Sequence, residues 1–396
     1  WGIDPKAETP AVKYNDGKDY VPTKGWTVFS HQFSSIAGAG PVTGAIQAAA
    51  FGWLPVLLWI LIGGVFFGAV TDFGALYASV KNEGKSMGMI IEKYIGKFGR
   101  KIFLLFCWLF TLIVIAAFAD MVAGTFNAYS VAGGQTTVVS TNGSAGTVSI
   151  MFMVFAVVFG LIQKKFNLSG WKEAVVGIAF IVASFVIGNF CPIILGKEAW
   201  SYITFVYIFF AAVMPMWLMK QPRDYMTTFM FIAMIVGAAL GLVVAHPSMN
   251  LPVYTGFNNA KLGTMFPILF VTVACGAVSG FHSLVSSGTS SKTVENEKDM
   301  LKVGYGAMIL ESLLAVLALC VAGAAAAADG TAATGTPFQI FSRGVAGFFE
   351  MFGVPVHFAT VFMTMCVSAL ALTSLDAVAR IGRMSFQELF SVDDME

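Results

Sequence analysis

Residues 28–49 read VFSHQFSSIAGAGPVTGAIQAA, an apolar stretch that two glycines and a proline interrupt near its middle. Pro41 lacks a backbone N–H, and Gly38 and Gly40 weaken a helix, so regular helical hydrogen bonding should stop here. Within a membrane, opened backbone is tolerated only where it lines a cavity or binds a ligand. We therefore predict a discontinuous transmembrane helix with a substrate site at its break. The expected site residues are Ser34, Ser35, Gly38, Ala39, Gly40 and Pro41.

A second interrupted stretch, residues 275–289, reads CGAVSGFHSLVSSGT. So many hydroxyl groups would be costly against lipid and should face an interior cavity. The stretch comes seven predicted crossings after the first, so the two should run in opposite senses, as the central helices of an inverted-repeat transporter do. Here we expect substrate binding by Ser279, His282, Ser286 and Ser287. For the first stretch, the alternative is that Gly38 and Gly40 only allow close helix packing.

The composition indicates a membrane protein throughout. Hydrophobic residues make up 57% of the 396 residues and charged residues only 11%, about half the share of a soluble domain. The net charge of +1 gives no reason to expect a nucleic-acid partner. A transmembrane helix needs about 20 apolar residues, and ten stretches meet or nearly meet this length. They are residues 28–49, 54–80, 102–128, 147–163, 173–195, 200–219, 226–246, 264–287, 303–325 and 354–379. The predicted fold is all-α and polytopic, with about ten transmembrane helices, some of them discontinuous.

The positive charges predict an orientation, because cytoplasmic loops are rich in Lys and Arg. If residues 1–27 are a cytoplasmic N-terminal segment, ten crossings place 20 of the 23 Lys and Arg residues on the inner side. The loop 81–101 is then cytoplasmic, and the loop 131–146 is external. Residues 28–383 form the transmembrane transporter domain, and residues 384–396 form a cytoplasmic tail.

Four acidic residues fall within the predicted spans: Asp72, Asp120, Glu311 and Asp376. Asp376 comes four residues before Arg380, so an ion pair on one helix face is expected. The other three have no cation within one helical turn. A carboxylate at such depth needs a proton, a bound cation or a partner on another helix. We expect Asp72, Glu311 and, nearer the outer face, Asp120 to couple ion movement to transport.

Enzymatic activity is not expected. Ser279 and His282 are three residues apart and could form a hydrolase pair, but no nucleophile elbow, HExxH or P-loop motif accompanies them. His282 could instead bind an anionic substrate group, whereas His31 is expected to be an interfacial residue. The five cysteines show no metal-binding spacing and should be small buried hydrophobic residues. No cofactor is expected besides a coupling H⁺ or Na⁺.

Two further segments are amphipathic but too short to span a membrane. The first follows a candidate N-cap, Ser86, and the second begins at Thr336 and Pro337. Each has one apolar face, so we expect both helices to lie on a membrane surface.

Several motifs together resemble the carbon starvation protein (CstA) family. They are Tyr14 to Thr23, Ser34 to Pro41, Thr71 to Phe73, Phe118 to Thr125, Gln221 to Tyr225 and Cys275 to Thr289. The resemblance extends over nearly the whole chain, and the last motif is the most specific. One departure is Thr289-Ser290-Ser291-Lys292, where the family is expected to read Thr-Thr-Pro-Lys. Family members normally have a membrane helix upstream of Tyr14, and this chain opens with Trp1, so we expect an upstream segment.

The resemblance implies a carrier of the amino acid/polyamine/organocation superfamily in the cytoplasmic membrane of a bacterium or archaeon, linked to nutrient starvation. Family members are described as peptide transporters, and some as proton-coupled pyruvate carriers. We therefore predict secondary active uptake of peptides or pyruvate by alternating access. The alternatives are a passive channel for small metabolites and a starvation sensor without transport. The expected surroundings are the lipid bilayer and a small-molecule substrate, with homo-oligomer formation, the substrate and the coupling ion left open.

Overall fold

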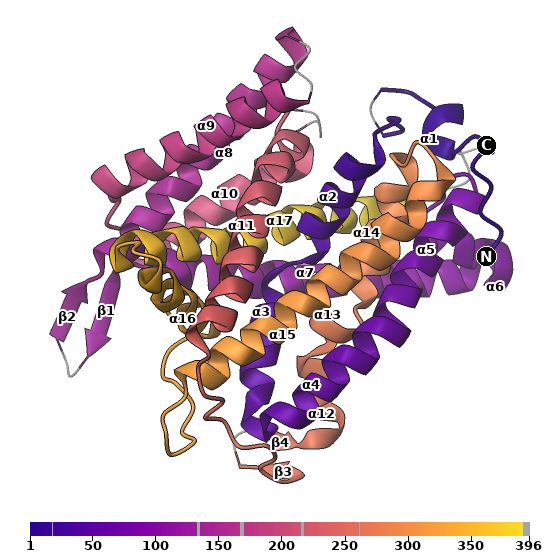
Figure 1. The fold of residues 1–396 in the computed structure, drawn as a ribbon. Coiled ribbons are helices and arrows are strands. Elements are labelled where there is room, and N and C mark those ends of the chain that lie inside the picture. Colours follow the sequence, from indigo (N-terminus) through magenta and orange to yellow (C-terminus); the bar gives the residue numbers. More distant parts are fainter. Residues whose placement is uncertain (18, 133–134, 167–169, 215–217, 261, 391–396) are drawn as a thin grey trace.

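The computed structural model describes residues 1–396 except 18, 133–134, 167–169, 215–217, 261 and 391–396. Helices dominate the described residues, as Figure 1 shows. Two small antiparallel sheets interrupt them, one of β1 (Tyr129–Ala132) with β2 (Gln135–Val138) and one of β3 (Asn258–Asn259) with β4 (Gly263–Thr264).

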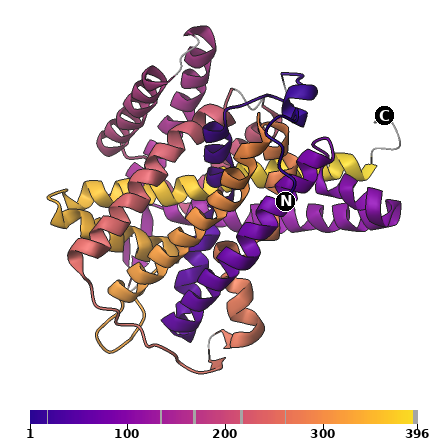
Figure 2. The same ribbon diagram turned by 45° about the vertical axis from the view of Figure 1, so that its right-hand side comes forward.

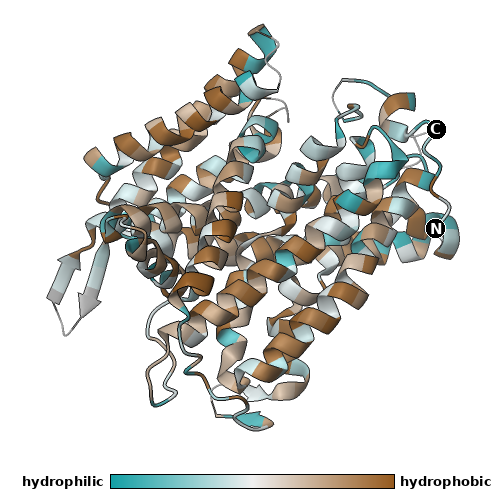
Figure 3. Ribbon diagram, viewed as in Figure 1, coloured by the Kyte–Doolittle hydropathy of each residue, from teal (hydrophilic) through white to brown (hydrophobic). Residues whose placement is uncertain are grey.

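Seven helices of the described residues are long and apolar enough to cross a membrane. They are Trp53–Lys81, which contains α4 (Trp53–Ile62) and α5 (Ala69–Lys81); α7 (Lys97–Phe126); α8 (Ser140–Phe166); α9 (Trp171–Phe190); α11 (Lys220–Ala245); Glu297–Ala325, which ends in α15 (Ala307–Ala325); and α17 (Val356–Phe390). Hydrophobic residues cover the bodies of these helices, and hydrophilic ones gather toward their ends (Figure 3). The predicted all-α polytopic membrane fold is confirmed.

The three remaining predicted spans are not among these seven helices. The stretch 200–219 corresponds to α10 (Lys197–Val213), a helix of 17 residues. The stretches 28–49 and 264–287 are both broken helices, so neither forms one continuous apolar helix.

The first break lies at Ala37 and Gly38, between α2 (Gly25–Ile36) and α3 (Ala39–Ala48). The ψ angle of Ala37 is 65°, and Gly38 is extended with φ −83° and ψ −157°. Pro41 follows in the first turn of α3, where its missing N–H leaves no hydrogen bond unmade. A 3₁₀ turn, Ala49–Phe51, ends the segment.

The second break lies at Val278 and Ser279, which are both extended. The segment consists of α12 (Met265–Thr272), α13 (Ala274–Ala277) and α14 (Gly280–Gly288). The predicted loss of helical hydrogen bonding near residues 276–280 is therefore confirmed, as it is near residues 38–41.

The two broken segments lie side by side and antiparallel, as Figures 1 and 2 show. Helix α3 packs against α12 and α13, and α2 packs against α14. Glycines permit this approach: a Cβ atom on Gly44 would lie 2.3 Å from the Thr272 carbonyl oxygen, and one on Gly40 would lie 2.4 Å from the Cys275 side chain.

Substitution of Gly44 by Ala should therefore destabilise the protein by about 1–3 kcal/mol, because the clash is with backbone that cannot rotate away. Gly347→Ala, on an exposed helical site with no atom within 4 Å of the added Cβ, is the matched control. Thermal unfolding of the purified variants in detergent measures the difference. Equal unfolding temperatures of the Gly44→Ala and Gly347→Ala variants would show that the contact between α3 and α12 tolerates an added methyl group.

A π-helical turn follows each broken segment. One, Gly63–Gly68, joins α4 to α5, and the other, Lys302–Gly306, precedes α15. Asp72 and Glu311 each lie nine residues after the first residue of their π-helical turn. This matching position, in helices that follow antiparallel broken segments, is what an inverted repeat would produce.

The N-terminal segment, which contains the short helix α1 (Pro10–Lys13), packs on the end of the molecule where α14 ends. Thr23 N–H donates to the Thr293 carbonyl at 2.9 Å, and Asp4 N–H donates to Glu297 at 2.8 Å. Glu297 begins a 3₁₀ turn, Glu297–Asp299, and Thr293 directly follows another, Ser290–Lys292.

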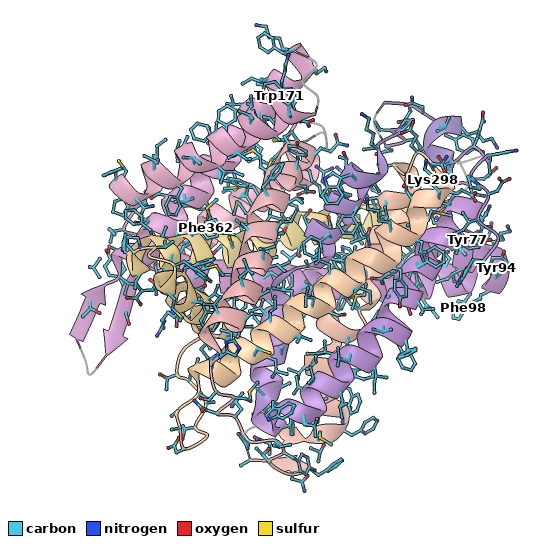
Figure 4. The ribbon with its side chains drawn as sticks, viewed as in Figure 1. Tyr77, Tyr94, Phe98, Trp171, Lys298 and Phe362 are labelled. Atoms are coloured by element: carbon cyan, nitrogen blue, oxygen red, sulfur yellow. The ribbon has the colours of Figure 1, made fainter. Side chains whose placement is uncertain are left out.

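The two short amphipathic helices have different environments. In α6 (Met87–Ile95), Ser86 caps the first turn by accepting from Met89 N–H. Tyr94 is 70% exposed and, beyond α6, Phe98 is 78% exposed; Figure 4 shows both at the edge of the molecule, as an interfacial helix requires. Helix α16 (Pro337–Met351) has the expected N-terminus but buries its apolar face against α11, α15 and α17. The predicted surface position of α16 is therefore wrong.

Candidate functional site

His282 lies between two acidic side chains in the interior of the protein. Its Nδ1 is 3.0 Å from Asp72 Oδ2, and its Nε2 is 3.3 Å from Glu311 Oε2. All three side chains are fully buried. They come from α14, α5 and α15, so the second broken segment holds its histidine between the two helices that carry a π-helical turn.

The charges of this cluster do not balance on their own. A protonated imidazole neutralises one of the two carboxylates, and the other still needs a proton or a bound cation. Asp72 Oδ1 and both oxygens of Glu311 make no hydrogen bond to the described residues. Buried acceptors without partners are costly, so the cluster is suited to hold one additional cation.

Cys275 extends this cluster toward a cavity. Its Sγ atom, a His282 ring nitrogen and a Glu311 oxygen all lie within 4.8 Å of one another. Cys275 also lines the cavity described next, so it lies between the cluster and the space where a solute would bind.

A cavity of about 780 Å³ lies at the two breaks. Gly38, Gly40, Ser279 and Gly280 line it from the broken segments, together with Ser374 of α17. Its apolar wall comes from α7, through Phe103, Phe106, Phe110 and Phe118. Helices α3 and α14 both begin here, and neither has a side-chain cap, so their free N–H groups favour a negatively charged group.

The predicted substrate residues divide into two groups. Gly38, Gly40 and Ser279 line the cavity. The others are not part of its lining: Ser34, Ser35, Ala39, Pro41, His282, Ser286 and Ser287 are buried around the breaks. Ser286, for example, accepts a hydrogen bond from Gln32 at 2.9 Å and so joins α14 to α2.

The structure brings Asp72 and Glu311 together but leaves Asp120 apart from them. The Asp120 side chain is 67% exposed and forms an ion pair of 2.7 Å with Lys197, which is 47% exposed. An ion pair in such contact with the surroundings needs no coupling cation, so we do not include Asp120 in the candidate site.

A second buried cluster surrounds Arg223 of α11. Its guanidinium contacts Asp376 of α17 and Asp224, and the Tyr207 hydroxyl donates to Asp376 at 2.8 Å. His31 Nδ1 is 2.9 Å from Asp224 Oδ2, which connects α2 to this cluster. Helix α2 thus connects this cluster to α14, the helix that carries His282, since the neighbouring Gln32 donates a hydrogen bond to Ser286.

Two predictions are corrected by this second cluster. Asp376 pairs with Arg223 and not with Arg380, whose guanidinium donates to the Met214 carbonyl at 2.8 Å. His31 is buried and paired with Asp224, so its predicted interfacial position is wrong.

The buried ion pairs of Arg223 and Asp224 were not predicted from the sequence. Arg223 and Asp224 stood only in the motif Gln221 to Tyr225 of the family resemblance, between the predicted spans 200–219 and 226–246. The signal that could have found them is the adjacent pair of opposite charges at the start of an apolar span, where a charge is seldom left unpaired.

Comparison with known proteins identifies relatives of this chain. The family model described as carbon starvation protein CstA matches residues 1–329 and 323–394. The pyruvate/proton symporter BtsT of Escherichia coli (strain K12) is 39% identical over 336 residues, which cover 81% of this chain and 45% of that protein. The peptide transporter CstA of the same strain is 36% identical over 80% of this chain and 45% of its own length. The peptide transporter CstA of Bacillus subtilis (strain 168) is 33% identical over 96% of this chain and 69% of its own length. The chain spans a little under half the length of the first two relatives.

Proposed function

The chain belongs to the carbon starvation protein CstA family, and from this premise we propose that it forms the core of a cation-coupled secondary transporter for peptides or pyruvate. The observation that carries the proposal is the buried cluster of one imidazole and two carboxylates, His282, Asp72 and Glu311, beside the breaks of two antiparallel helices. Relatives are named as transporters of these two substrate classes, one of them as a proton symporter.

Substrate recognition follows from the chemistry of the cavity. Peptides and pyruvate both carry a carboxylate, and the uncapped N-termini of α3 and α14 present N–H donors and positive dipole ends at the cavity. The phenylalanines of α7 offer an apolar wall to the rest of the substrate. We propose that the carboxylate binds between Gly38 and Ser279.

Coupling follows from the unbalanced charge. A monovalent cation, H⁺ or Na⁺, binds at Asp72 and Glu311 and stabilises the arrangement in which α14 packs against α5. Since α14 begins at the cavity and carries His282, a movement that rearranges the cavity also rearranges the cation site. A cation and a substrate that favour the same arrangement are thereby coupled.

Uptake into proteoliposomes tests this function. The purified protein should accumulate either labelled pyruvate or a labelled dipeptide when an inward gradient of H⁺ or Na⁺ is imposed, and vesicles without protein should not. A passive channel would only equilibrate the substrate, whatever the ion gradient. A starvation sensor would give no uptake of either compound.

We further propose that the protein lies in the cytoplasmic membrane of a bacterium or archaeon, with its first residues and the loop 81–101 on the cytoplasmic side. Single cysteines introduced at the exposed Lys101 and Thr137, in a background without native cysteines, test this with a membrane-impermeant reagent on intact cells. We expect labelling at residue 137 and little at residue 101. The reverse pattern would invert the orientation.

A further inference from the structure

We infer that Cys275, His282 and Glu311 form a binding site for a borderline-soft divalent transition-metal ion, with Zn²⁺ as the probe. Their ligand atoms lie within 4.8 Å of one another, although the three residues come from α13, α14 and α15. Thiolate sulfur, imidazole nitrogen and carboxylate oxygen are the ligand types that Zn²⁺ binds in proteins.

Buried polar atoms without a hydrogen bond point to a ligand independently of this spacing, although His282 Nε2 and Glu311 Oε2 lie 3.3 Å apart as an ion pair. His282 Nε2 and both carboxylate oxygens of Glu311 make no hydrogen bond to the described residues, and both side chains are 0% exposed. Leaving such atoms without partners costs free energy, and one metal ion would bind a nitrogen and at least one of the oxygens.

Asp72 orients the histidine for this purpose. Its Oδ2 lies 3.0 Å from His282 Nδ1, so a proton on Nδ1 is held there, and once Nε2 gives up its own proton its lone pair is free to bind a metal ion beside Glu311. This carboxylate–histidine arrangement is the usual support of a metal-binding imidazole. Zn²⁺ binds nitrogen, oxygen and sulfur at about 2.0–2.3 Å, so small rotations of the Cys275 and Glu311 side chains would close the site.

The charges of the three ligands and their access from the cavity also suit a bound Zn²⁺ ion. On binding, the Cys275 thiol and the protonated Nε2 of His282 release their protons to solvent, and the sulfur and the nitrogen bind the ion. The thiolate and the Glu311 carboxylate together neutralise Zn²⁺, and the Nδ1–H of His282 stabilises the remaining negative charge of Asp72 by a hydrogen bond. Cys275 lines the cavity, so the ion has a route to the site and a water molecule can supply the fourth ligand.

Calorimetric titration of Zn²⁺ into the purified protein tests the site. We expect one Zn²⁺ per chain, with a Kd that rises on the order of 100-fold or more in Cys275→Ser. Cys320→Ser is the matched control, since Cys320 is also a partly buried free cysteine but is not part of the cluster. Its Kd should equal that of the unmodified protein.

Cobalt gives a second readout that identifies the sulfur ligand. Co²⁺ should produce a sulfur-to-metal charge-transfer absorption in the unmodified protein and in Cys320→Ser, and none in Cys275→Ser. Equal Zn²⁺ affinity in the two serine variants, or no bound metal, would overturn the site. Because these experiments measure metal binding and not transport, a negative result would not contradict the proposed transport activity.

Discussion

Replacement of Glu311 by Gln is expected to abolish gradient-driven accumulation of substrate and to leave exchange of substrate across the membrane largely intact. Gln retains the shape of Glu311 and removes its charge, so His282 and Asp72 then balance each other without a further cation. A tenfold gradient of one coupled monovalent ion supplies about 1.4 kcal/mol, which corresponds to about tenfold accumulation. The variant should lose this accumulation, as measured by labelled substrate in proteoliposomes.

The control for this prediction is Asp120→Asn, which removes a carboxylate from an exposed ion pair away from the cluster. It should accumulate substrate as the unmodified protein does. If the Glu311→Gln variant still concentrates substrate tenfold, Glu311 has a structural role and the coupling site lies elsewhere.

Replacement of Arg223 by Gln is expected to destabilise the protein by about 3–5 kcal/mol, because it leaves Asp376 and Asp224 buried without their guanidinium partner. Thermal unfolding in detergent measures the loss. Arg343→Gln is the control, since Arg343 is exposed and bonds only to Gln339 among the described residues; its change should stay within about 0.5 kcal/mol.

A double variant separates an uncompensated charge from a simple loss of packing. Arg223→Met combined with Asp376→Leu replaces both partners by apolar groups, so it should recover much of the stability lost in Arg223→Gln. If Arg223→Gln unfolds at the same temperature as Arg343→Gln, the buried cluster around Arg223 does not hold α11 to α17.

Helix breaks were predictable because their causes are local. Gly38 and Pro41 weaken helical hydrogen bonding in any surroundings, and the glycines and hydroxyls around Ser279 do the same in the second segment. Those residues interrupt both helices within one or two positions of the predicted places.

Ion partners were not predictable, because they come from distant parts of the chain. Asp376 has a cation one helical turn away, yet its partner is Arg223, 153 residues distant. His31 and Asp224 are 193 residues apart. An acidic residue inside a span shows that some partner is needed, but only tertiary packing selects which one.

Amphipathic patterns likewise indicate a helix and an apolar face without indicating what covers that face. The sequences of α6 and α16 both have the expected N-caps and apolar stripes. Helices α3, α11, α15 and α17 pack against α16, whereas Tyr94 of α6 stays exposed. A surface helix and a core helix therefore share one sequence pattern.

We propose that substrate and cation move together through the site at the helix breaks. The most direct measurement records both fluxes in the same proteoliposomes, with labelled substrate and a reporter of H⁺ or Na⁺. An inward substrate gradient alone should drive the cation inward, in the unmodified protein and not in Glu311→Gln. Substrate entry without any cation movement in the unmodified protein would contradict coupling and would leave a passive channel.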